Sequence, residues 1–296
     1  MSNDSTRLGL LCALAAALIW SGFILVSRVG GISELTPYDV IAIRYATCSV
    51  ILLPIWLYFY RFNLLSWRYA ITAVIGGLAY AIFAFKGFKL SSALHGGILL
   101  PGLIPVFVAI SSRMLVGAKL SGSKALGLGL IVTAITGLFI NEVLKAGSLP
   151  LGDVFFVMAA LCWGLYSVLI NKWAISPWQA TCSLAFFTSI IYLPVYLAFL
   201  PKNILNADMN DVLLQMFYQG FLASIIQMLL YVKAVKIIGA QGMGSFMALV
   251  PVVAGLFGII ILNEPYTELL WLALVLVSLG VWISNRGLSV AMAKPS

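Results

Sequence analysis

Apolar residues run along the chain in ten long stretches, and polar or charged residues gather between them. A helix needs about 20 predominantly apolar residues to cross the hydrocarbon core of a bilayer. The stretches lie near residues 7–28, 38–60, 68–88, 92–114, 123–141, 151–172, 178–200, 211–235, 241–262 and 268–287. This pattern predicts an all-α integral membrane protein with ten transmembrane helices, joined by loops too short to form a soluble domain.

The second half of the chain repeats features of the first half at a nearly constant distance. Trp20 stands in the stretch ALIWSGFI, and Trp163 stands in ALCWGLYS, 143 positions later (163 − 20 = 143). Further pairs in the same order are Leu8-Gly9 with Leu151-Gly152, Thr36-Pro37 with Ser176-Pro177, Pro54 with Pro194, Pro105 with Pro251, and Gly137 with Gly280. This self-similarity predicts two five-helix repeats, residues 1–146 and 147–296, which together form one membrane domain.

Five helices is an odd number, so the second repeat must enter the bilayer in the opposite orientation. Inverted repeats are typical of secondary transporters, whose substrate sites lie near the midplane between the two halves. A two-fold axis in the membrane plane would bring Trp20 and Trp163 to similar depths beside one central space. Tryptophan in membrane helices concentrates at the interfaces, so an indole at mid-depth indicates either a polar cavity or helix packing.

Composition supports lipid as the solvent of this chain. Hydrophobic residues make up 62% of its 296 residues and charged residues only 9%, against roughly 25% charged in soluble domains. The four cysteines, Cys12, Cys48, Cys162 and Cys182, all lie in apolar stretches and are expected to be buried thiols. The first apolar stretch runs past Trp20 to Val26, longer than the core of a cleaved signal peptide.

The net charge of +8 is better explained by membrane topology than by nucleic acid. Basic residues gather on the cytoplasmic side of membrane proteins. With the N-terminus inside, the inner set is Arg7, Arg61, Arg68, Arg113, Lys119, Lys124, Lys172, Lys233, Lys236, Arg286 and Lys294, and the outer set is Arg28, Lys86, Lys89, Lys145 and Lys202. This imbalance predicts that both termini are cytoplasmic.

Two segments carry a resemblance to a known family. Residues 87–110 and residues 234–267 each combine small residues, a proline with apolar neighbours and a long apolar run, and the second ends in Asn263-Glu264-Pro265. Together with Arg44-Tyr45, they resemble the drug/metabolite transporter superfamily of the EamA type, and most of all its bacterial aromatic amino acid exporters. The first copy departs from the pattern, because Lys119 follows Gly117-Ala118 where the glutamate would stand, and the second copy has Leu184 in place of the arginine. The resemblance implies export of small metabolites across a bacterial inner membrane.

Polar and aromatic side chains within the apolar stretches are the candidate substrate-binding residues. An aromatic cavity with few polar groups suits a small, mostly apolar zwitterion, such as an aromatic or neutral amino acid, better than a sugar or a phosphate. For His95 the alternative is an interfacial residue bonded to a loop carbonyl. The candidates are Trp20, Tyr80, His95, Trp163, Tyr166, Gln227 and Tyr231.

Three prolines are candidates for helix kinks that move during gating. Pro101 and Pro105 lie within the fourth helix and Pro251 lies within the ninth. Proline removes a backbone donor and distorts the preceding turn, so these positions should face protein or a cavity rather than lipid.

Acidic side chains fall in loops or in first helical turns, and none lies at mid-depth. Proton-coupled carriers hold such groups within the membrane. The sequence therefore predicts transport that is not tightly coupled to protons through a buried carboxylate. Arg44 is the one charge well inside a helix. Three interpretations are open: its side chain snorkels outward, it pairs with Asp39, or it attracts a substrate carboxylate.

Other function classes lack their required residues. An intramembrane enzyme needs an acid pair, a metal cluster or a nucleophile with a base, and a single histidine leaves zinc without ligands. A channel usually assembles around rings of carbonyls or charges. We expect no catalytic residue, no metal, no cofactor, no nucleic-acid partner and a monomer in the bilayer. The alternative substrate classes are drugs or other metabolites, and nucleotide sugars would require more cations at mid-depth.

Overall fold

A computed structural model describes residues 3–59, 61–148 and 150–286. Ten of its helical spans are long and apolar enough to cross a membrane, which confirms the prediction of ten transmembrane helices. Seven spans are single helices: α1 (Asn3–Ile32), α2 (Pro37–Tyr58), α5 (Ala93–Val116), α6 (Gly122–Ala146), α7 (Leu151–Lys172), α8 (Pro177–Phe199) and α12 (Glu268–Arg286). The third span consists of α3 (Trp67–Thr72), η1 (Ala73–Ala79) and α4 (Tyr80–Leu90). The eighth and ninth spans consist of α9 (Met209–Gln215), η2 (Met216–Ile226), α10 (Gln227–Met247) and α11 (Val250–Leu262), and α10 contributes to both. Residue 287, where the tenth predicted stretch ends, and Lys294 lie outside the described residues.

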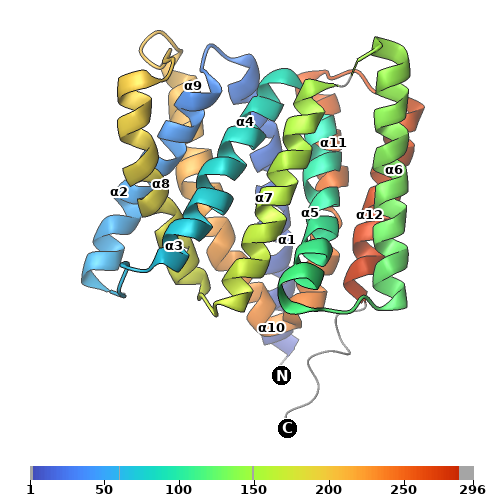
Figure 1. The fold of residues 1–296 in the computed structure, drawn as a ribbon, viewed down its shortest axis with the longest axis horizontal. Helices are drawn as coiled ribbons and strands as arrows, with labels where there is room; N and C mark the ends of the chain where they lie inside the picture. Colours follow the sequence, from blue (N-terminus) through green and yellow to red (C-terminus); the bar gives the residue numbers. More distant parts are fainter. Residues whose placement is uncertain (1–2, 60, 149, 287–296) are drawn as a thin grey trace.

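The helices form one antiparallel bundle with two distinct ends (Figure 1). The end at which α1 begins and α12 ends is called the near end, and the opposite one the distal end. At the sides of the view, α2 lies against α8 and α6 lies against α12. The remaining spans fill the middle, where a single large hydrophobic core joins them.

Helix starts are fixed by local chemistry that the two halves share. Thr36 caps α2 and Ser176 caps α8, and each is followed by proline in the first turn. The third helical residues, Asp39 and Gln179, bond back to the capping residue and complete a capping box. The predicted pairing of Thr36-Pro37 with Ser176-Pro177 therefore corresponds to two helices that begin in the same way.

Two spans contain π-helical segments at matching places. The segment η1 begins at Ala73 and η2 begins at Met216, 143 residues later (216 − 73 = 143). A π-helix leaves backbone groups less regularly paired than an α-helix and is frequent at functional sites. Gly77 of η1 packs against Thr188 of α8, and a Cβ on this glycine would overlap that side chain. The equivalent glycine of η2 packs against Thr47 of α2 in the same manner.

The candidate kink prolines occupy two different kinds of helix position. Pro101 and Pro105 lie inside an unbroken α5. Pro251 instead lies in the first turn of α11, because the ninth span is interrupted at Ala248 and Leu249. The first turn is a position that tolerates proline without distortion. A second break falls at Gly239, whose φ of 77° separates the eighth span from the ninth within α10.

Contacts between the spans follow a reciprocal pattern. The first span of the first half, α1, packs along α10 and α11 of the second half. The first span of the second half, α7, packs along α5 and α4 of the first half. Inverted copies of one five-helix unit would produce this correspondence.

Candidate functional site

Three of the candidate aromatic residues meet inside the bundle. The ring centroids of Tyr80 and Trp163 are 4.8 Å apart, and those of Trp163 and Tyr166 are 5.1 Å apart. Trp163 and Tyr166 lie three residues apart and so share one face of α7, whereas Tyr80 opens α4. Both tyrosines are buried and the indole is half-buried. We call these three residues the aromatic cluster.

The π-helical segment η1 shapes the wall beside the aromatic cluster. Gly76 lies directly against the Tyr166 ring, and a Cβ at this position would overlap the ring. The next carbonyl, that of Gly77, accepts a hydrogen bond of 3.0 Å from the Tyr45 hydroxyl of α2. A glycine pair within a π-helix therefore lets an aromatic ring and a phenol from two other spans reach the backbone.

The other candidate residues lie apart from this contact. Trp20 is half-buried and packs against the main core from α1, and Gln227 is half-buried at the start of α10. Tyr231, one turn further along α10, leaves 37% of its surface exposed. Substrate binding by these residues, as by the aromatic cluster, stays a prediction.

The two best-defined hollows of the described residues lie away from the aromatic cluster. Two shallow apolar hollows of about 530 and 290 Å³ lie on the outer sides of α8 and α6. The aromatic cluster lines neither of them, and its rings pack directly on one another. A ligand ring would therefore have to separate these rings in order to bind among them.

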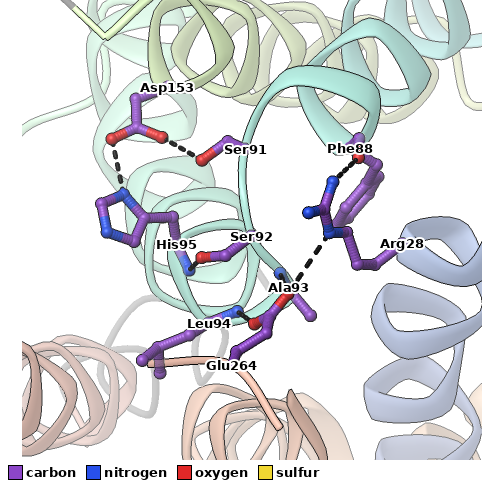
Figure 2. A network of polar contacts seen from close by, with 9 residues as sticks. All are labelled: Arg28, Phe88, Ser91, Ser92, Ala93, Leu94, His95, Asp153 and Glu264. Carbon is purple, nitrogen blue, oxygen red and sulfur yellow. Dashed lines mark hydrogen bonds and ion pairs between the residues drawn. The ribbon is translucent and has the colours of Figure 1, made fainter. Parts of the chain in front are cut away.

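A buried carboxylate ties four spans together at the distal end (Figure 2). Glu264, just beyond α11, accepts hydrogen bonds from the backbone N–H groups of Ala93 and Leu94 at 2.7 and 2.9 Å. The same carboxylate lies 3.3 Å from Nε of Arg28, near the end of α1. Arg28 also donates to the carbonyl of Phe88 in α4 at 2.8 Å. A negative charge at the N-terminus of α5 is stabilised by the free amides and the helix dipole.

His95 joins a second polar contact at the distal end, between α5 and α7. Its Nδ1 lies 2.6 Å from an Asp153 carboxylate oxygen, and the other oxygen accepts a 2.6 Å hydrogen bond from Ser91. Figure 2 shows the imidazole facing this carboxylate on the side of α5 away from Arg28. The histidine partner is thus a buried aspartate, which fits the interpretation of His95 as a polar contact and not the alternative of a bond to a loop carbonyl.

A third contact at the distal end joins α2 to α8 through Asp39. Its carboxylate accepts hydrogen bonds from the Tyr196 hydroxyl at 2.5 Å and the Asn203 backbone at 3.0 Å, besides those from Thr36. Its oxygens are therefore already occupied, and Arg44 donates instead to Gln219 at 3.0 Å. The suggested pairing of Arg44 with Asp39 is wrong.

These three carboxylate centres, Glu264, Asp153 and Asp39, make up what we call the distal latch. The predicted place of the acids, in loops and first turns, holds for these three but not for Glu142, which lies near the end of α6. The sequence assigned none of them a role. One local signal was available for Glu264: Asn263 adopts φ of 51°, a conformation that asparagine tolerates at a helix end, and this turns the next residue back toward the bundle. Both ion pairs within the described ranges belong to the distal latch.

The contacts at the near end include bonds to neutral backbone carbonyls. Lys172 donates to the Leu115 carbonyl at 3.2 Å, and Asn285 donates to the Gly244 carbonyl at 3.1 Å. Both ion pairs of the described residues lie instead at the distal end.

Ten spans, aromatic side chains within the bundle and a charged closure at one end are the architecture of a membrane transporter. Comparison with protein families agrees: the model of the EamA-like transporter family matches residues 7–140 and again residues 150–286. The chain belongs to this family.

Two individual comparisons extend this finding. The "Uncharacterized transporter YyaM" of Bacillus subtilis (strain 168) is 25% identical over 228 residues, which cover 72% of this chain and 71% of the relative. A solved crystal structure covers 96% of both chains with a TM-score of 0.59 and 19% identity, a similarity that concerns the fold alone.

Proposed function

We propose that this protein exports small, mostly apolar metabolites, and that aromatic or neutral amino acids are its substrates. The observation that carries the proposal is the aromatic cluster, which sets two phenols and an indole together inside a bundle of the EamA-like family. Stacking against a ligand ring contributes about 1 kcal/mol beyond the burial of area, so binding is loose enough for release.

The transport cycle in this proposal is alternating access by two inverted five-helix halves. The reciprocal packing of α1 and α7 and the two π-helical segments support this symmetry. In such carriers the halves rock around a central site and open it to one side at a time. Closing the distal end therefore corresponds to one of the two states, and separating the partners of the distal latch leads to the other.

The proposed setting is a bacterial inner membrane with both termini in the cytoplasm. Among the described residues, basic side chains favour the near end by ten to five, which the positive-inside rule explains. On this topology the distal latch faces outward, and in the proposed cycle its contacts close the outward side.

Transport by purified protein in liposomes tests the proposed function. With no pH gradient imposed, we expect saturable uptake of labelled phenylalanine down its own gradient, because the described acids lie at the distal latch or in other peripheral turns. Unlabelled tryptophan and leucine should compete, and glucose 6-phosphate should not. Uptake that requires a pH gradient would refute the uncoupled mechanism, and competition by the sugar phosphate would refute the substrate class.

A further inference from the structure

Arg44 is a charged side chain well inside a membrane span, and the described structure gives it no counter-ion. It lies seven residues after Pro37 (44 − 37 = 7), about 10 Å along α2 at 1.5 Å per residue. Within the described part of the chain the ion pairs are Arg28–Glu264 and His95–Asp153, and neither includes Arg44. Charges inside a membrane bundle are costly and normally pair with one another or serve a substrate pathway.

Neutral groups hold the guanidinium in place. One terminal nitrogen donates to the Gln219 side chain at 3.0 Å, and that amide donates in turn to the Ser27 hydroxyl at 3.0 Å. Ser27 and Gln219 are buried, so this arrangement is fixed before any ligand arrives. A frame of this kind orients the cation but does not neutralise it.

Part of the donor capacity of Arg44 remains unused. Its Nε is buried and has no hydrogen-bond acceptor within the described residues. A buried donor without a partner costs free energy, more so when it belongs to a charged group. Guanidinium and carboxylate groups match in geometry, so a carboxylate is the ligand class that best suits the unpaired Nε–H donor.

Aromatic residues connect this cation with the aromatic cluster. The guanidinium carbon lies 5.3 Å from the Phe23 ring centroid and 5.7 Å from that of Tyr45. Tyr45 bonds to Gly77, next to the glycine on which Tyr166 lies. The cation is therefore linked through Tyr45 and η1 to the Tyr166 side of the aromatic cluster.

We infer that Arg44, held by Gln219 and flanked by Phe23 and Tyr45, binds the carboxylate of the transported substrate. The inference rests on the proposed function and adds the polar half of the site: a ring placed at the aromatic cluster and an anionic group placed at Arg44. The ligand class is a ring-bearing carboxylate, which includes aromatic amino acids.

Binding of phenylacetate to purified protein in detergent tests this inference without relying on transport. We expect millimolar phenylacetate to raise the melting temperature of the wild type and of Arg68→Gln, an exposed arginine at the near end. Arg44→Gln should lose this rise, and Arg44→Lys should keep part of it because a point charge remains. Phenylacetamide has the ring but no charge. For the same rise in the melting temperature of the wild type, at least about ten times more phenylacetamide than phenylacetate should be needed, as expected for loss of a charge-assisted pair.

The outcomes separate the two proposals. An equal response of the wild type to phenylacetate and phenylacetamide overturns the role of Arg44, even if phenylalanine is transported. Equal stabilisation by potassium chloride at the same ionic strength also overturns it, since the site would then bind any small anion. If Arg44→Gln fails to fold, Arg44→Ala takes its place. The inference is overturned if Arg44→Ala still prefers phenylacetate to phenylacetamide as the wild type does, or if the wild type shows no such preference. Failure of phenylalanine transport, with carboxylate binding intact, contradicts only the proposed amino acid substrate.

Discussion

Replacing Trp163 by alanine is expected to lower kcat/KM for aromatic amino acid transport about fivefold, because a stacking surface worth about 1 kcal/mol to the ligand ring is lost from the aromatic cluster. Trp163→Phe keeps a ring and should retain most of the activity. The measurement is the initial rate of labelled phenylalanine uptake in liposomes, normalised to the amount of folded protein.

Trp282→Ala is the matched control for this experiment. Trp282 is a half-buried indole that packs against the same core from α12, at the other side of the bundle from α2 and α8. Both alanine variants lose a large half-buried side chain and the stability that goes with it. Equal transport by the two variants would contradict the assignment of the aromatic cluster to the substrate.

Replacing Glu264 by alanine should open the distal end. The substitution removes the acceptor of two α5 amides and leaves Arg28 without its carboxylate. Hydrogen bonds to charged groups contribute about 1.5–3 kcal/mol, and partial exposure of Arg28 reduces the total, so we expect a shift of about tenfold toward the open state. Glu264→Gln keeps an acceptor without the charge and should have an intermediate effect.

The readout is the reaction of Leu94→Cys with a membrane-impermeant maleimide applied from the distal side. Leu94 is 2% exposed in the closed arrangement, so labelling in an otherwise unchanged chain should be slow. The four native cysteines are buried, and protein without Leu94→Cys provides the blank. Glu268→Ala removes an exposed acid at the same end and is the control. Identical labelling rates in the Glu264 and Glu268 variants would show that Glu264 does not hold the distal end closed.

The spans and their caps could be predicted from sequence because both depend on neighbouring residues. Apolar length decides whether a helix crosses a membrane, and Thr36-Pro37 with Asp39 is a complete start signal within four residues. The contact between Trp163 and Tyr166 also follows from helical spacing. By contrast, Tyr80 joins them only because α4 packs along α7, which no local pattern shows.

The distal latch could not be predicted because its partners are far apart in the chain. Glu264 bonds to residues about 170 positions away, and Asp153 meets a histidine 58 positions earlier. In sequence these acids look like ordinary loop residues, and only the fold brings them to buried amides and cations. The same limit explains Arg44, whose nearest acid in sequence is already bonded to Tyr196 and Asn203.

A reversible cross-link across the distal end tests the central claim, that transport requires this end to open. A Cβ at Gly258 would lie 3.4 Å from that of Ala93, close to the range of about 3.5–4.5 Å that a disulfide spans, and 2.8 Å from a Glu264 oxygen, which must shift to admit it. In the variant with Ala93→Cys and Gly258→Cys, oxidation should abolish phenylalanine transport and reduction should restore it, with the reduced protein as its own control. Undiminished transport by protein shown to be fully cross-linked would contradict the account.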